Sequence, residues 1–132
     1  AEQGIAFGSH SVTHPDLNAL AATELDQELE KSKREIESHT GRPADYFCYP
    51  YGRWNPAVRA AAARFYRGAC STGAGVVEPD ADRFALPRVD AHYVRSPAWF
   101  RRLFTRRFDA YVAARRLIRR WRGQPEGIYS RV

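Results

Sequence analysis

Short apolar runs alternate along the chain with longer segments whose apolar residues recur at helical spacing. The runs at 4–8, 45–49 and 67–71, together with an extended piece at 84–90, have the length and composition of strands. Their near-continuous apolar character is typical of buried parallel strands. Strands that alternate with helical segments in this rhythm predict βαβ units and an α/β fold with a mostly parallel sheet.

Helical spacing is clearest after the first strand. A helix is expected to begin at Thr23, with Asp26 three residues later in the manner of a capping box, and to end at Gly41. The charged residues from 24 to 37 are expected to be solvated and to have no function. The stripe that faces the core consists of Leu25, Leu29, Ser32 and Ile36.

Proline residues mark the starts of two further helices. Asn55 and Pro56 predict an N-cap and a first helical position for an Ala-rich helix over 57–65. Ser96 and Pro97 have the same arrangement at the start of a C-terminal helical region.

Positive charge is concentrated in this C-terminal region. The chain has 132 residues and a formal net charge of +6, but residues 1–94 carry a net −3 and residues 95–132 a net +9. We expect the helical region to break near Thr105 and to stop at Gly123. Its apolar face carries Phe100, Phe104, Phe108, Tyr111, Ile118 and Trp121.

Two interpretations of residues 96–132 are open. They form an outer helix that docks its aromatic residues on the sheet, or a basic amphipathic tail that binds an anionic membrane surface or another polyanion. Nucleic-acid binding is not favoured, because no recognition fold surrounds the arginines.

The composition is that of one soluble globular domain, with 44% hydrophobic and 27% charged residues. No run of about 18 apolar residues predicts a membrane-spanning helix, and no signal peptide is visible. The chain starts without Met, so we expect a fragment or a processed chain, and the compartment is open between the cytoplasm and the cell envelope. Cys48 and Cys70 have neither zinc-like nor redox-like spacing and are expected to be buried, reduced thiols.

The candidate chemistry lies in the segment Ser9-His10-Ser11-Val12-Thr13-His14-Pro15, directly after the first strand. Neutral histidine is the commonest metal ligand in proteins, and zinc sites often take two histidines from one short segment. Pro15 disfavours a helix at His14. We therefore place the pair on a loop at the C-terminal end of a strand, where α/β folds carry their active sites. Two unrelated surface histidines are the alternative.

Two motifs, in order, resemble the polysaccharide deacetylase family, or NodB-homology domain. His10, Ser11 and His14 match the family's His-(Ser/Thr)-x-x-His motif, and residues 47–52 match its third motif in the Phe-x-Tyr-Pro-Tyr-Gly form. The resemblance covers roughly residues 4–95. It implies a distorted β/α barrel, of which this chain would hold the C-terminal part. It also implies removal of N-acetyl, or sometimes O-acetyl, groups from a polysaccharide.

The resemblance assigns roles to individual residues. His10 and His14 would bind a divalent metal, usually zinc, that polarises the substrate carbonyl and supplies the attacking water. The main-chain N–H of Tyr51 would help to hold the oxyanion. Tyr49, Pro50 and Tyr51 would line the sugar site, although Tyr49 suits a core position equally well.

The chain departs from the family pattern in three ways. The Thr-Phe-Asp-Asp motif, which supplies the catalytic base and the third metal ligand, does not occur in residues 1–132; its usual spacing would place it before Ala1. The arginine of the third motif would fall at Cys48, and Arg88 is a candidate to supply that positive charge. The late Leu-x-His motif is not evident, and His92 follows Arg88 too closely to fill it.

We therefore expect a partial metal-dependent polysaccharide deacetylase domain over residues 1–95, a weak catalyst or none by itself, followed by the basic tail. One rival hypothesis is a non-catalytic half-barrel that binds a partner or an envelope surface through that tail. Another is a small metal-binding protein that recruits Asp16 or Asp90 as third ligand. An open sheet edge beside residues 4–8 would permit a homodimer.

Overall fold

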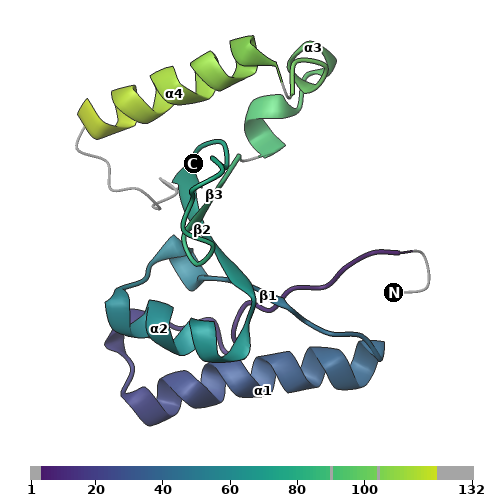
Figure 1. Cartoon of the computed structure of the whole chain (residues 1–132), viewed down its shortest axis with the longest axis vertical. Coiled ribbons are helices and arrows are strands. Elements are labelled where there is room, and N and C mark those ends of the chain that lie inside the picture. Colours follow the sequence, from purple (N-terminus) through teal and green to yellow (C-terminus); the bar gives the residue numbers. More distant parts are fainter. Residues whose placement is uncertain (1–3, 90, 104, 122–132) are drawn as a thin grey trace.

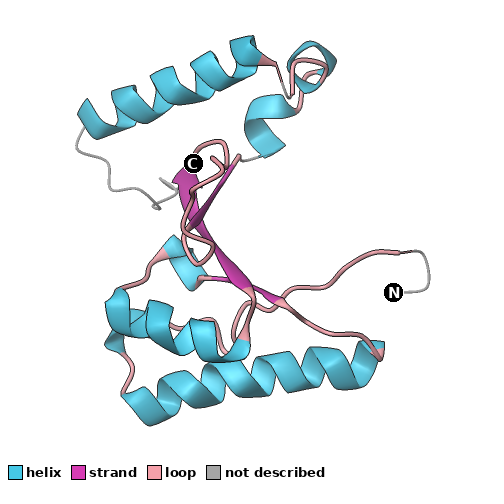
Figure 2. Cartoon of the chain, in the orientation of Figure 1, coloured by secondary structure: helices cyan, strands magenta, loops and turns pink. Residues whose placement is uncertain are grey.

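The structure is a computed structural model that describes residues 4–89, 91–103 and 105–121. Its sheet consists of β1 (Tyr46–Cys48), β2 (Gly68–Ala74) and β3 (Leu86–Arg88), in that order and all parallel. The helix α2 (Pro56–Phe65) connects β1 to β2, whereas a loop connects β2 to β3 (Figure 2). The parallel α/β arrangement predicted from the alternation of apolar runs is confirmed.

Residues 4–8 do not form the strand that their apolar character predicts. Only Ser9 pairs with the sheet, through an isolated parallel bridge to Phe47. Ile5 is 58% exposed and Phe7 is also exposed, so this segment buries little apolar surface that could hold it in place. The predicted parallel pairing of the first segment with the strand at 45–49 is thus right in direction, but only Ser9 of the first segment takes part in it. A homodimer through this edge stays a prediction.

Helix α1 (Ala22–Thr40) begins one residue before its predicted start and uses a different cap. The carboxylate of Glu24 accepts the N–H of Ala21 at 3.0 Å. Glu24 is thus the acidic residue of the capping box, a role that we expected for Asp26. Asp26 forms an ion pair with Arg64 of α2 instead. The helix ends as predicted at Gly41, whose φ of 65° lies in the left-handed region that favours glycine.

The core joins the sheet to α1 and α2, which lie side by side (Figure 1). Leu25, Leu29 and Ser32 of the predicted stripe are buried, and Ile36 is half-buried. The N-cap of α2 is also as predicted, because the side chain of Asn55 accepts the N–H of Val58 at 2.8 Å. The buried apolar cluster contains Leu17, Leu25, Leu29, Phe47, Tyr49, Val58, Ala61, Ala62, Tyr66, Ala69 and Phe84.

The described residues also form three short 3₁₀ helices: η1 (Leu17–Ala19), η2 (Pro50–Gly52) and η3 (Ala91–Val94). The helices α3 (Pro97–Phe100) and α4 (Arg106–Trp121) lie beyond the end of β2 and β3, away from α1 and α2 (Figure 1). Ser96 caps α3 as predicted, and Thr105 precedes α4 at the expected break. No helix in the described residues is long and apolar enough to cross a membrane.

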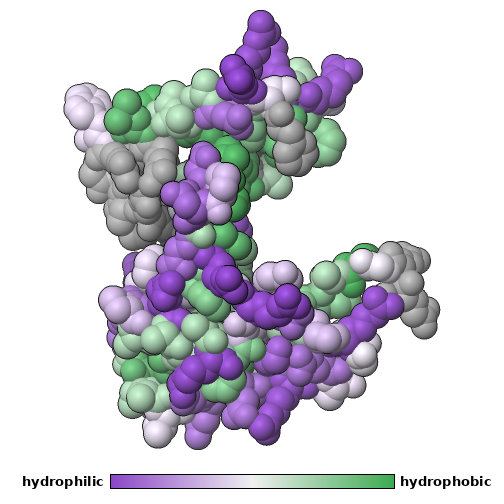
Figure 3. All heavy atoms as spheres, viewed as in Figure 1, coloured by the Kyte–Doolittle hydropathy of each residue, from purple (hydrophilic) through white to green (hydrophobic). Residues whose placement is uncertain are grey.

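The predicted apolar face of the C-terminal helices is only partly buried. Phe108 is buried, and the ring of Tyr111 stacks on Trp99 with centroids 4.3 Å apart. Ile118 and Trp121 are exposed, Trp121 by 87%, as is Phe100 of α3. Hydrophobic and hydrophilic residues lie next to each other on the surface of these helices (Figure 3). Phe104 and Gly123 lie outside the described residues, and a domain boundary at residues 95 and 96 stays a prediction.

Gly52 is expected to be intolerant of a side chain. Its φ is 68°, and a Cβ atom there would lie 2.0 Å from Thr72 Oγ1 and 2.6 Å from Thr72 N. Gly41 has nearly the same φ, 65°, with nothing within 4 Å, so Gly41→Ala measures the backbone strain alone, about 1–2 kcal/mol. Gly52→Ala should lower the free energy of unfolding by about 1–3 kcal/mol more, measured by urea denaturation. Equal losses in the two variants would contradict this steric account.

Candidate metal centre

The backbone of Ser9 fixes the histidine loop to the sheet. The N–H of Ser9 donates to Tyr46 O at 2.8 Å, and the N–H of Cys48 donates to Ser9 O at 2.9 Å. His10 follows directly, and its Nδ1–H donates to Cys48 O at 2.6 Å. The first imidazole is therefore held at the C-terminal end of β1 by both its backbone and its side chain, as the motif predicts.

The structure brings the two imidazole rings together. Nε2 of His10 lies 3.1 Å from Nε2 of His14, and the ring centroids are 4.7 Å apart in an edge-on arrangement. Because Nδ1 of His10 donates to a carbonyl, the neutral ring leaves Nε2 with a free lone pair. Two zinc–nitrogen bonds of about 2.0–2.1 Å at a tetrahedral angle separate the nitrogens by about 3.3–3.4 Å. The donor pair thus fits a zinc-like cation.

The loop between the histidines has an uncommon backbone. Ser11 has a φ of 65° and His14 a φ of 58°, which is the left-handed region that non-glycine residues rarely enter. The position of the pair on a loop is as predicted, but the extended geometry expected for His14 before Pro15 is wrong. The N–H of His14 donates to Ser11 Oγ at 3.0 Å, and this local bond accompanies the left-handed turn.

Tyr51 lies beside the second histidine of the site. Its ring packs edge-on against His14 with centroids 4.7 Å apart, and it is 51% exposed. Its φ of 57° turns the chain sharply within η2. Of the three residues expected to line a sugar site, Tyr51 is the one whose ring surface is accessible. The role of its main-chain N–H stays a prediction.

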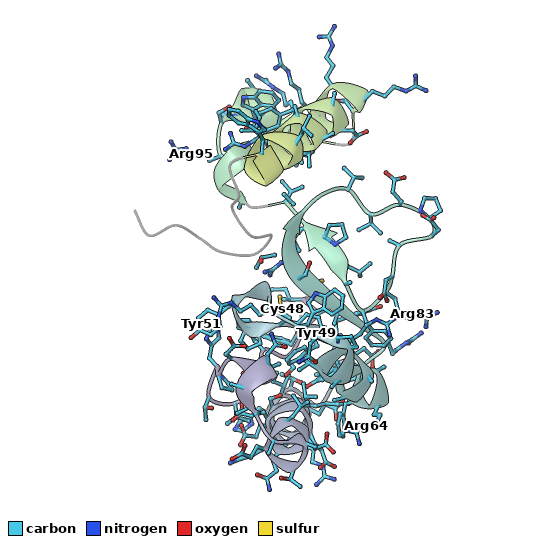
Figure 4. All side chains as sticks on the ribbon, turned by 90° about the vertical axis from the view of Figure 1, so that its left-hand side faces the viewer. Cys48, Tyr49, Tyr51, Arg64, Arg83 and Arg95 are labelled. Carbon is cyan, nitrogen blue, oxygen red and sulfur yellow. The ribbon has the colours of Figure 1, made fainter. Side chains whose placement is uncertain are left out.

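Tyr49 and Pro50 are buried, so a sugar cannot reach their side chains in this arrangement. The hydroxyl of Tyr49 donates to Phe84 O at 2.9 Å, and burial raises the pKa of this phenol. Of the two roles considered for Tyr49, sugar contact and core packing, the structure therefore supports core packing. Figure 4 shows Tyr49 beside Cys48 inside the fold and Tyr51 at its margin.

An ion pair connects the histidine loop to the turn that carries Tyr51. Arg53 Nη1 lies 2.8 Å from Asp16 Oδ2, and the guanidinium stands 5.9 Å from the centroid of the Tyr51 ring. The hydrogen bond from Arg53 lowers the pKa of Asp16. Because this carboxylate is engaged by Arg53, it does not join the histidine pair. The described part of the chain contains no group of three or more His, Cys, Asp or Glu side chains that could hold a metal.

Arg88 reaches across the sheet to Cys48. Its Nε donates to Ser71 O at 2.7 Å, and its Nη1 donates to Cys48 Sγ at 2.8 Å. Cys48 and Cys70 are opposite each other in the β1–β2 register, and both are half-buried free thiols rather than fully buried ones. Burial raises the pKa of Cys48, although the charge of Arg88 opposes this.

The expectation that the charged residues from 24 to 37 are simply solvated is wrong for Glu28, whose carboxylate contacts the loop between the two histidines. The sequence gives only a weak indication of this contact: Glu28 is next to Leu29 in the buried stripe of α1 and lies in the N-terminal half of the helix. Asp90 and the side chain of His92 lie outside the described residues, so their candidate roles stay predictions.

Comparison with known proteins identifies the family. A family model described as polysaccharide deacetylase matches residues 1–66, half of the chain. The chain belongs to the polysaccharide deacetylase family. This membership, together with the parallel sheet, confirms the predicted fold as part of the family's distorted β/α barrel.

Three similar proteins each cover about two thirds of the chain. The Bacillus subtilis protein YxkH, whose name places it among the polysaccharide deacetylases, is 30% identical over 90 residues, or 67% of this chain and 32% of that protein. BC0361, a polysaccharide deacetylase from Bacillus cereus, superimposes with a TM-score of 0.61 at 30% identity and covers 67% and 28% of the two chains. The Streptococcus pyogenes deacetylase PplD, solved with acetate, gives 0.64 at 27% identity, with 67% and 39% covered. The chain thus spans about a third of the length of these relatives.

The hydrogen bonds predict the proton positions in the metal-free pair. His10 carries its proton on Nδ1, so His14 must donate from Nε2 to His10 Nε2 when both rings are neutral. Long-range ¹H–¹⁵N spectra above pH 7.5 should show these two different tautomers. Added zinc should convert His14 to the Nδ1–H tautomer, because only an unprotonated nitrogen is a ligand. The same tautomer for both rings without metal would contradict the geometry.

Proposed function

We propose that this chain supplies the two-histidine metal centre of an enzyme that removes acetyl groups from an N- or O-acetylated polysaccharide. The observation that carries the proposal is the 3.1 Å approach of the two Nε2 atoms within a histidine motif of a polysaccharide deacetylase domain. The structural relative solved with acetate is consistent with the product of such a reaction.

His10 and His14 would hold the cation, with His10 fixed in the ligand tautomer by Cys48 O. When bound, a divalent cation of this kind acts as a Lewis acid towards a carbonyl oxygen and lowers the pKa of a water molecule. Tyr51 would border the reacting acetyl group, offering its main-chain N–H to the developing oxyanion and its exposed ring to the sugar. The proposal assigns the general base and the third ligand to no residue of this chain.

Arg88 would supply the positive charge that the family's third motif takes from an arginine. The sequence match places that arginine at Cys48, and the guanidinium of Arg88 lies against the Cys48 side chain. The same Cys48 accepts the His10 Nδ1–H through its carbonyl oxygen. From its place against Cys48, the guanidinium would stabilise anionic groups near the proposed metal centre and keep a neighbouring carboxylate ionised.

A second candidate function is binding without catalysis through the C-terminal helices. The exposed apolar residues Leu117, Ile118 and Trp121 stand on a helix rich in arginine, which supports contact with an anionic surface. If the whole protein releases no acetate when metal is supplied, this alternative is favoured.

Loss of a metal ligand should abolish deacetylation. In the whole protein with zinc or cobalt supplied, His14→Ala should lower acetate release from an N-acetylglucosamine oligomer more than about a hundredfold. Loss of a residue that only hydrogen-bonds to a metal ligand typically costs about tenfold to hundredfold. His39→Ala is the matched control, because His39 stands at the end of α1, where its ring bonds the backbone of its own helix. Unchanged activity in His14→Ala would refute the proposed centre.

The charge supplied by Arg88 can be tested by moving it. Arg88→Ala should lower kcat by roughly tenfold to hundredfold, and adding Cys48→Arg should recover part of the loss because the guanidinium returns to the same place from β1. Arg83→Ala, at an exposed neighbouring arginine, is the control. A double variant as inactive as Arg88→Ala, or full activity in Arg88→Ala, would show that this charge has no such role.

A further inference from the structure

Glu28 of α1 binds the loop that carries the two histidines. Its Oε2 accepts the N–H of Val12 at 2.7 Å and that of Thr13 at 3.0 Å, and its Oε1 accepts the Thr13 hydroxyl at 2.8 Å. These three bonds join positions 15 and 16 residues apart. One carboxylate thus holds the two residues that lie immediately before His14.

The loop presents a small anion-binding concavity to this carboxylate. Two consecutive N–H groups converge on one oxygen just after Ser11, whose φ is 65°. Successive N–H groups next to a left-handed residue form a nest that binds anions. Here the anion is a side chain of the same chain. Hydrogen bonds from N–H groups to an ionised carboxylate are stronger than those to a neutral acceptor.

A second contact from α1 holds the start of the same loop. Ser9 Oγ lies 2.6 Å from Ser32 Oγ, and both side chains are buried. Ser32 also lies 3.2 Å from the Tyr66 hydroxyl, which donates to Leu29 O. With Ser9 fixed by Ser32 and residues 12 and 13 fixed by Glu28, both ends of the turn between the histidines are anchored to one helix.

We propose that Glu28 is a positioning residue, whose carboxylate holds the loop in the turn that brings His14 Nε2 to His10 Nε2. Its effect on metal binding rests on the proposed function, whereas its effect on the loop does not. Burial by itself would raise the pKa of Glu28, but the hydrogen bonds from Thr13 and Val12 together outweigh it and hold this pKa below its ordinary value.

The test compares Glu28→Ala with Glu30→Ala in the whole protein. Glu30 is the matched control, since it lies on the same helix and pairs with the exposed Arg34 rather than with the loop. Cobalt(II) affinity, followed by visible absorption, should fall by roughly tenfold to hundredfold in Glu28→Ala and stay unchanged in Glu30→Ala. Glu28→Gln keeps an acceptor oxygen and should retain most of the affinity.

Two further measurements separate positioning from general stability. Amide hydrogen exchange at Val12 and Thr13 should accelerate in Glu28→Ala while exchange in β1 and the melting temperature stay near those of the unaltered protein. The two different metal-free tautomers of His10 and His14 should also be lost. A role in stability alone would lower the melting temperature without these local changes, and that result would overturn the proposal.

The outcomes also separate this proposal from the proposed function. If the unaltered protein binds no cobalt, the metal centre is wrong, and the exchange and tautomer measurements still decide the role of Glu28. If cobalt binds equally well to Glu28→Ala and to the unaltered protein, Glu28 is not a positioning residue. Should Glu28→Ala fail to fold, Thr13→Val removes one of the three bonds and should show a smaller loss in affinity.

Discussion

The candidate site depends on one backbone contact, the bridge between Ser9 and β1. Two hydrogen bonds, to Tyr46 O and from Cys48 N, fix Ser9 although residues 4–8 form no strand. That contact puts His10 within reach of Cys48 O, which selects the tautomer with Nε2 free. Without it, only the side-chain contact between Ser9 and Ser32 would hold the start of the histidine loop, because residues 4–8 are exposed. A single bridge residue therefore determines where the imidazole of His10 lies.

The two loops of the site are strained, and they hold each other. Ser11, His14 and Tyr51 all have positive φ values without being glycine, at a typical cost of about 1–3 kcal/mol each. The packing of Tyr51 on His14 and the Asp16–Arg53 ion pair join the two loops directly. Residues in such conformations persist only where the surroundings over-determine them. Strained residues of this kind cluster at functional sites, and here they surround the histidine pair.

The sequence predicted the elements whose signals are local. Asn55, Gly41 and Ser96 cap their helices as expected, because capping needs only neighbouring residues. The sequence wrongly predicted a strand at residues 4–8, because a strand depends on pairing partners that an apolar pattern does not reveal. The accessible Tyr51 and the buried Tyr49 could not be told apart, since both belong to one motif and only the turn at Tyr51 separates them. Glu28 was missed because its partners are 15 and 16 residues away.

Arg88 places its charge beside the position of the third motif that Cys48 occupies. The register aligns Cys48 with Cys70 and Cys70 with Leu86, so Arg88 starts two strands away from Cys48. Its long side chain crosses β2, bonds Ser71 O on the way and ends at Cys48 Sγ. A small residue at position 48 is needed for this, because an arginine there would occupy the same space. The small side chain in the third motif and the arginine of β3 are thus two parts of one arrangement, and neither can be interpreted from the motif alone.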